Sequence, residues 1–171
     1  MKALFLAQAH AGRWANQILF AEMAKLSPEQ WTQKSAVNFG SVQGIANHLL
    51  LADRLWLQRF TGEGEPLKTA DAVPYPSLAA LQTERESEDE RTVAFAEALD
   101  PARFGAMLRY TTTEGTARAL PFGLCVAHFF NHQTHHRGQL HALLGVHGLK
   151  CPDIDLLYYA PAAKLFAPDV N

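Results

Sequence analysis

Apolar residues recur at helical spacing in four long stretches of this sequence, and that period constrains the fold more than any other feature. At about 100° per residue, apolar positions spaced in this way fall on one stripe of a helix. The stretches run from the N-terminus to about Leu26, from Ser41 to about Thr61, from Ser77 to about Leu99, and from about Pro121 to Leu144. The sequence therefore predicts an all-α fold.

Local signals place the ends of these helices. Residues 27–30, Ser-Pro-Glu-Gln, have the pattern of a capping box with proline at the first helical position, which predicts one short helical turn. Ser41 is a suitable N-cap for the second long helix, and the Gly- and Pro-containing residues 62–66 end it. These signals therefore predict the position of the short turn and both ends of the second long helix.

The period changes between the third and fourth long helices. Residues 107–112 and 116–120, separated by the Thr-Glu-Gly of residues 113–115, predict a small β-hairpin. Residues 153–159 predict a short final helix. Four long amphipathic helices pack most simply as an antiparallel four-helix bundle, with the hairpin before the last long helix and residues 1–171 as a single domain.

The charge balance excludes several classes of partner. The 171 residues include 15 Lys and Arg against 17 Asp and Glu, without a basic cluster, so neither nucleic acid nor an anionic membrane is an expected partner. No apolar stretch approaches the roughly 18 residues of a membrane span. Two cysteines, Cys125 and Cys151, make no disulfide framework and suit a reducing compartment. We expect a cytoplasmic protein.

Five of the eight histidines lie between His128 and His141 on the predicted last helix. Helical geometry places His132 and His136 in the middle of its apolar stripe, and it places His48 on the core face of the second long helix. Burying an unpaired polar group costs about 1–3 kcal/mol, and one divalent metal ion would satisfy all three imidazoles. Two histidines four apart, with a third on a neighbouring helix, form a workable ligand set.

Alternatives to this ligand set exist. His128 also lies four residues from His132, but it is about 12 Å along the helix axis from His136, so one ion cannot bind all three. His132 and His136 straddle the centre of the stripe better, and we prefer them. His128, His135 and Gln139 are then expected beside the ligands or in a pocket wall. Each histidine taken alone is more often a core residue than a ligand.

Charged residues near the histidines give weaker signals. Arg137 projects about 140° from His132, so we expect it to pair at the surface or to anchor the C-terminal segment rather than to bind substrate. Asp53 projects away from His48 by a similar angle. For Arg59, a salt bridge at the helix end is favoured over a place at a pocket mouth. No residue is predicted as a general base.

Three motifs resemble the DinB/YfiT-like family of metalloenzymes, named for a damage-inducible protein. They are residues 131–139 (NHQTHHRGQ), residues 47–57 (NHLLLADRLWL) and residues 14–16 (WAN). The His-His-Arg-Gly-Gln run within the first motif is the most specific. The resemblance extends in order over nearly the whole chain and includes the late Asp-Ile-Asp-Leu of residues 153–156.

The resemblance implies a four-helix bundle, often a homodimer, that holds one divalent metal ion per chain, commonly nickel or zinc. Carried over by position, its three histidine ligands are His48, His132 and His136. This is the set that helix geometry also favours. Enzymes similar to the family include thiol-dependent S-transferases and a thiol-dependent isomerase, so the resemblance implies a small-molecule substrate and a low-molecular-weight thiol as partners.

Three functions are compatible with such a site. Three protein ligands leave a coordination position for water or substrate, which is typical of catalytic metal sites. We therefore expect a metal-dependent enzyme of the thiol-dependent transferase or isomerase type, with a metal-dependent hydrolase as the first alternative. The second alternative is a non-enzymatic, metal-stabilised dimer. Leu50 and Leu57 form an apolar line, with Phe60 nearby, that suits either a dimer interface or packing against the third long helix.

Overall fold

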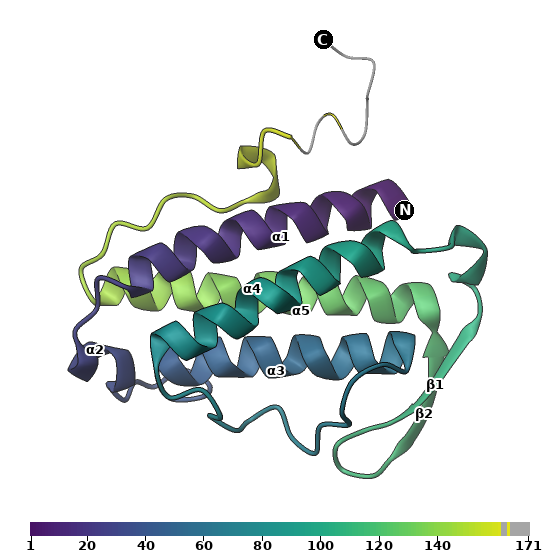
Figure 1. Cartoon of the computed structure of the whole chain (residues 1–171), viewed down its shortest axis with the longest axis horizontal. Helices are drawn as coiled ribbons and strands as arrows, with labels where there is room; N and C mark the ends of the chain where they lie inside the picture. The colour runs from purple at the N-terminus through teal and green to yellow at the C-terminus, as the bar shows by residue number, and fades with distance from the viewer. Residues whose placement is uncertain (162–163, 165–171) are drawn as a thin grey trace.

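The computed structural model describes residues 1–161 and 164, and it is mainly helical, with one two-stranded hairpin (Figure 1). The expected single domain of residues 1–171 includes residues 162–163 and 165–171, which lie outside the described residues. In chain order the elements are α1 (Lys2–Met23), α2 (Pro28–Thr32), α3 (Val42–Thr61), α4 (Leu78–Glu97), the 3-10 helix η1 (Pro101–Arg103), β1 (Met107–Thr111), β2 (Ala117–Pro121), α5 (Phe122–Val146) and the 3-10 helix η2 (Leu156–Tyr158).

The predicted helix ends are confirmed to within a few residues. The Ser27 hydroxyl accepts from the N–H of Gln30, and the Gln30 side chain accepts from the N–H of Ser27, which completes the capping box of α2. Ser41 and Ser77 cap α3 and α4 through their hydroxyl groups. Gly62 ends α3 with φ at 77°, a left-handed conformation that favours glycine.

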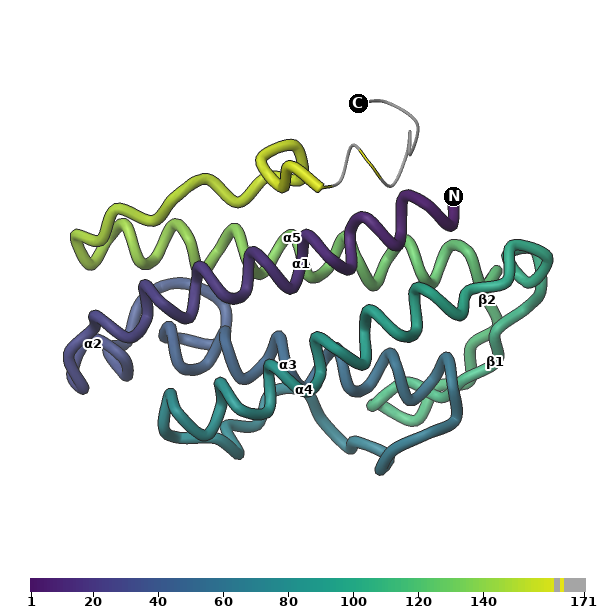
Figure 2. The backbone as a smooth tube through the Cα atoms, turned by 45° about the horizontal axis from the view of Figure 1, so that its top comes forward, coloured from purple at the N-terminus to yellow at the C-terminus, as the bar shows by residue number. Residues whose placement is uncertain are grey.

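The segment from Gly62 to Ser77 returns along α3, so α3 and α4 run in the same direction (Figures 1 and 2). Gln43, near the start of α3, donates to the carbonyl oxygen of Pro76 at 2.8 Å, just before α4 begins. Near the other end, the rings of Phe60 and Phe95 stack with centroids 5.0 Å apart. Residue numbers thus rise together along both helices, as they do in parallel neighbours.

Of the other neighbouring helix pairs, α1 and α5 are parallel, whereas α1–α4 and α3–α5 are antiparallel. Phe5 and Phe130 stack at the start of α1, which runs parallel to α5, whereas Asn16 of α1 meets Asp89 of the antiparallel α4. The expectation of an antiparallel arrangement is correct for α1–α4 and α3–α5, and it is wrong for α1–α5 and α3–α4. The cause is the long 62–77 connection, because only short connections force successive helices to be antiparallel.

Two apolar clusters fill the interior, one at each end of the long helices. The cluster at the hairpin end is aromatic and includes Phe60, Phe122 and Phe129. The cluster at the opposite end is largely aliphatic and includes Ile45 and Leu140. Between these two clusters lies a layer of buried polar side chains, here called the polar layer, to which all four long helices contribute. Its members are Asn16, Asp53, Arg85, Asp89, Gln133 and Arg137.

The polar layer is held by ion pairs and hydrogen bonds. Arg85 donates to Oδ2 of Asp53 at 2.6 Å and pairs with Oδ1 of Asp89 at 3.1 Å, while the Asn16 amide donates to the same Asp89 oxygen at 2.8 Å. Burial raises the pKa of Asp53 and of Asp89, and the Arg85 charge opposes that shift. A buried charge without its partner is costly, so we expect this layer to favour one alignment of the four helices.

Two members of this layer are more deeply buried than their helical angles suggest. Asp53, which projects away from His48, has an exposed fraction of 1%. Of the two alternatives for Arg137, pairing at the surface is wrong, since its exposed fraction is 8%, and anchoring of the C-terminal segment stays a prediction. Both side chains are buried because α3 contacts both α4 and α5, and α5 contacts both α1 and α3. A direction away from one apolar stripe therefore still leads into the interior.

The apolar line on α3 is buried inside the chain. Leu50 and Leu57 have exposed fractions of 0%, and each belongs to an interior cluster with a residue of α4, Leu81 for Leu50 and Val93 for Leu57. Of the two alternatives for this line, packing against the third long helix is correct. The line is not available as a dimer interface.

Smaller differences concern the hairpin and the C-terminal segment. The predicted hairpin is confirmed, with Met107 opposite Pro121 and Thr111 opposite Ala117. The predicted helix over 153–159 shortens to the 3-10 turn of η2. Within residues 1–161 and 164, no helix combines the length and the apolar character that crossing a membrane requires.

Candidate metal centre

Three histidine side chains converge between α3 and α5. His132 and His136 lie one turn apart on α5, and His48 faces them from the antiparallel α3. One ring nitrogen from each lies within 4.8 Å of the other two, and the Nε2 atoms of His132 and His136 are 3.1 Å apart. Nitrogens that share a metal ion at 2.0–2.1 Å stand roughly 3–3.5 Å apart, so small adjustments would bring all three onto one ion.

Hydrogen bonds at Nδ1 orient two of the rings. Nδ1–H of His48 donates to the carbonyl oxygen of Ala70 at 2.9 Å, and Nδ1–H of His136 donates to Oε1 of Gln139 at 2.8 Å. With Nδ1 protonated, Nε2 of each neutral ring keeps its lone pair. Outer hydrogen bonds of this kind commonly fix the tautomer of metal-binding histidines.

The electrostatic environment keeps the imidazoles neutral. Burial, together with the neighbouring histidines, lowers the pKa of His132 to about 3. Burial lowers the pKa of His136 to about 4, although the hydrogen bond that His136 donates to Gln139 opposes this shift. Burial also lowers the pKa of His48. The cluster therefore presents uncharged nitrogen donors at neutral pH, which is the form that binds metal.

The fit of a metal ion to these residues rests on Nε2 of His48. This atom is buried and has no hydrogen-bond partner among the described residues. A buried polar atom without a partner is rare because it loses its hydration without replacement. An ion held by the three histidines would satisfy it, so the residues fit a divalent metal with imidazole ligands.

Phe39 covers one side of the cluster. Its ring stacks on His48 with centroids 3.7 Å apart and meets His136 edge-on at 5.5 Å. Phe39 has φ at 64°, unusual for an aromatic residue, and its carbonyl lies so close to Gly44 that a methyl group there would collide with it. Gly44 thus allows the 33–41 connection to approach the start of α3 and to place Phe39 over the site.

The residues expected beside the ligands occupy three different positions. Gln139 contacts His136 through the hydrogen bond described above. His135 is exposed, with its ring 4.8 Å from that of His136. His128 is also exposed, and its ring lies 5.8 Å from His132 and 5.0 Å from Trp56. His128 and Trp56 therefore continue a wall of rings from the histidine cluster toward the hairpin.

Arg59 lies at the far end of this wall. Its guanidinium packs over Trp56 at 4.9 Å and Tyr110 at 4.5 Å, and it donates to the carbonyl oxygen of Thr111 at 3.1 Å. It lines a cavity of about 370 Å³ with Tyr110 and Arg109. The prediction of a salt bridge is wrong, because Arg59 forms no ion pair among the described residues. Its contacts instead hold the hairpin against α3.

Sequence reasoning missed the contribution of the connecting segments. Ala70 and Asp71 belong to the 62–77 connection, and the Asp71 carboxylate lies 3.5 Å from Nδ1 of His48. Phe39 belongs to the 33–41 connection. No periodicity marks such residues, because a connection has no repeating direction. The unusual length of the 62–77 connection was the only signal in the sequence.

Comparison with known proteins gives the family. The sequence profile described as the DinB family matches residues 6–169. Protein DinB of Bacillus subtilis (strain 168) is 26% identical over 141 residues, which cover 77% of this chain and 78% of that protein. No solved structure was found to match the chain. Because the profile spans both helices that carry the three histidines, together with the rest of the long helices, this chain belongs to the DinB family.

Proposed function

We propose that this chain is a metal-dependent enzyme that binds one divalent ion, nickel or zinc, through His48, His132 and His136. One observation carries the proposal: Nε2 of His48 is buried and has no hydrogen-bond partner within residues 1–161 and 164, beside two further imidazole nitrogens that lie 3.1 Å apart. We also infer that the four long helices form the four-helix bundle that the family resemblance implies, with the direction of each helix as described above.

A bound divalent ion would supply a Lewis acid that lowers the pKa of a thiol or a water molecule at the open coordination position. The protein would supply the ligand geometry. Ala70 and Gln139 hold the tautomers of His48 and His136, and Phe39 keeps bulk water from one side of the cluster. The exposed His128 lies beside His132, and we propose that a substrate approaches the cluster from this side.

We propose thiol transfer as the reaction class, with a low-molecular-weight thiol as the first substrate and a small electrophile as the second. A cobalt-loaded sample tests this. Glutathione should produce a saturable sulfur-to-cobalt absorption band, and chlorodinitrobenzene should then be consumed faster than with the His132→Ala variant.

Two other experimental outcomes would contradict thiol transfer and favour a different function. Hydrolysis of nitrophenyl acetate without any thiol, lost in His132→Ala, would favour a hydrolase. A metal that raises the melting temperature, with no turnover of thiol, ester or amide probes, would favour a non-enzymatic role. A homodimer is a further proposal, and size-exclusion chromatography with light scattering tests it.

A further inference from the structure

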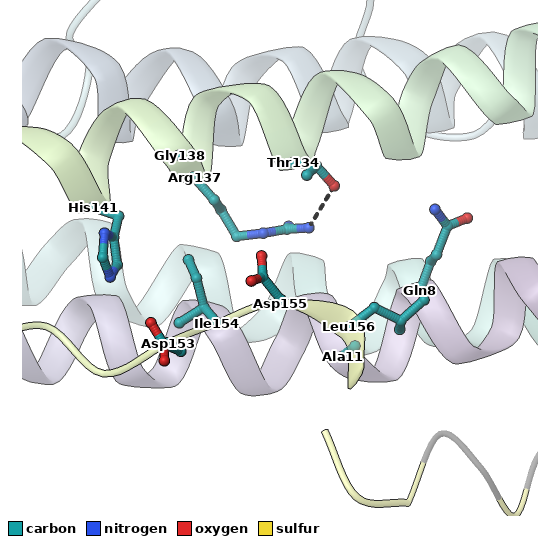
Figure 3. A pocket seen from close by; sticks show the side chains of 10 residues that line it. All are labelled: Gln8, Ala11, Thr134, Arg137, Gly138, His141, Asp153, Ile154, Asp155 and Leu156. Atoms are coloured by element: carbon teal, nitrogen blue, oxygen red, sulfur yellow. Dashed lines mark hydrogen bonds between the residues drawn. The ribbon is translucent and has the colours of Figure 1, made fainter. Parts of the chain in front are cut away.

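A second cavity, of about 580 Å³, lies between α1, α5 and the C-terminal segment, here residues 149–161 (Figure 3). It shares no lining residue with the three-histidine cluster. Arg137 and Thr134 line it from α5, Gln8 lines it from α1, and Asp153 and Asp155 line it from the C-terminal segment. The cavity is therefore a site of its own, and its polar groups come from three different parts of the chain.

Arg137 is the charged group at the base of this cavity. Its exposed fraction is 8%, and no carboxylate of the described residues forms an ion pair with it. Its only hydrogen bond among these residues is a long one of 3.4 Å to the Thr134 hydroxyl. A guanidinium carries five N–H donors, so most of the donors of Arg137 have no acceptor in the part of the chain that the structure describes and are available to a ligand in the cavity.

The wider charge balance limits what such a ligand can be. In the polar layer, the single charge of Arg85 pairs with both Asp53 and Asp89, which leaves one negative charge in excess. Arg137 offsets that excess at longer range. A ligand with a net negative charge would upset this balance in a buried region, whereas a ligand that is neutral overall would not.

Acceptors for a cationic group lie on the other walls of the same cavity. Figure 3 shows Arg137 reaching from α5 toward the C-terminal segment and Asp155 reaching toward α5 from that segment. Asp153 lines the same wall. Oε1 of Gln8 is buried without a hydrogen-bond partner among the described residues, so it also requires a donor. The cavity thus presents donors on one wall and acceptors on two others.

We propose that this cavity binds an aliphatic α-amino acid as its zwitterion. The carboxylate lies on the guanidinium of Arg137, since a planar guanidinium matches a carboxylate in a bidentate manner. The ammonium lies toward Asp155. Ala11, Ile154 and Leu156 provide the apolar surface for the aliphatic side chain.

Isothermal titration calorimetry with L-leucine on the full chain tests the proposal. L-leucine should bind saturably, whereas isocaproate, which lacks the amine, and isoamylamine, which lacks the carboxylate, should each bind at least about tenfold more weakly. Asp155→Asn should weaken L-leucine binding by about tenfold or more, because it removes the charged partner of the ammonium. This substitution is at an exposed position and leaves the buried core intact.

Two controls separate this site from the rest of the molecule. Glu97→Gln removes another exposed carboxylate, on α4, and should leave L-leucine affinity unchanged. His132→Ala should also leave it unchanged, because the cavity and the three-histidine cluster share no residue. Arg137→Gln should abolish binding; if that variant does not fold, Asp155→Asn decides. The proposal is overturned if L-leucine gives no heat up to about 10 mM, if both single-charge analogues bind as tightly, or if Asp155→Asn binds like the unaltered chain.

Discussion

The ring of Phe39 stacks on the imidazole of His48, with centroids 3.7 Å apart and planes 16° from parallel. The contact joins a residue of a connecting segment to a candidate metal ligand on α3. Because the stacked ring covers one face of His48, it restricts both the motion of the imidazole and the access of water to it. The protection of the metal centre therefore depends on a residue outside the long helices.

Replacing Phe39 with alanine should loosen the metal centre without removing a ligand. We expect one ion per chain to remain bound but to dissociate faster into a chelator, and the free energy of unfolding to fall by about 1–2 kcal/mol, less than for a fully buried Phe. Phe95→Ala is the matched control, since Phe95 is also half-buried and stacks on Phe60 at 5.0 Å. Equal metal dissociation rates in the two variants would contradict the role given to Phe39.

Gln139→Leu should weaken metal binding through His136. The substitution removes the acceptor of the Nδ1–H of His136, which holds that ring in the tautomer with a free Nε2. Loss of such a partner commonly costs 10- to 100-fold in metal affinity, and we expect a decrease in that range, about tenfold or more, by competition with a chromophoric chelator. Gln17→Leu, at an exposed position on α1, should have no effect.

Asp53→Ala should destabilise the fold strongly. Asp53 pairs with Arg85 at 2.6 Å in the polar layer, and removing one partner leaves a buried charge uncompensated. We expect a loss of about 3–5 kcal/mol in the free energy of unfolding, measured with urea. Glu90→Ala breaks the exposed pair with Arg13 and should cost less than about 1 kcal/mol. Similar losses in both variants would show that the polar layer does not organise the helices.

The metal-free protein should lose stability as the pH falls below about 6.5. In the unfolded chain the histidines take up protons near that pH, whereas burial lowers the pKa of His132 to about 3 and that of His136 to about 4 in the folded protein. The unfolded state therefore binds more protons between these values, and acid favours unfolding. Melting temperatures from pH 7.5 to pH 4.5 measure the effect, which should be smaller in His132→Gln than in His141→Gln. A melting temperature independent of pH in the unaltered chain would contradict it.

Helical periodicity predicted the burial of side chains where a helix has one buried face, and it did not do so where a helix has two. The helical angles of His48, His132 and His136 predicted that these side chains face one another. The prediction succeeds because all three lie on the faces where α3 meets α5. The burial of Asp53 and Arg137 was not predicted, because α4 and α1 cover further faces of the same two helices.

The other differences between prediction and structure concern the relative directions of the helices and the segments that connect them. Helical periodicity defines the faces of a helix but not which way its neighbour runs, so the parallel pairing of α3 with α4 depended on the length of the 62–77 connection. The contributions of Phe39 and Ala70 depend on contacts between segments far apart in the sequence. Such contacts leave no local pattern.

Metal content per chain is the most direct test of the central claim that three histidines hold one divalent ion. The unaltered chain is loaded with zinc or nickel, desalted and analysed by mass spectrometry of the metal, beside His48→Ala, His132→Ala, His136→Ala and the control His141→Ala. We predict one tightly bound ion in the unaltered chain and the control, and loss of that ion in the other three. Retention of one ion per chain by His132→Ala, at the affinity of the unaltered chain, would contradict the account.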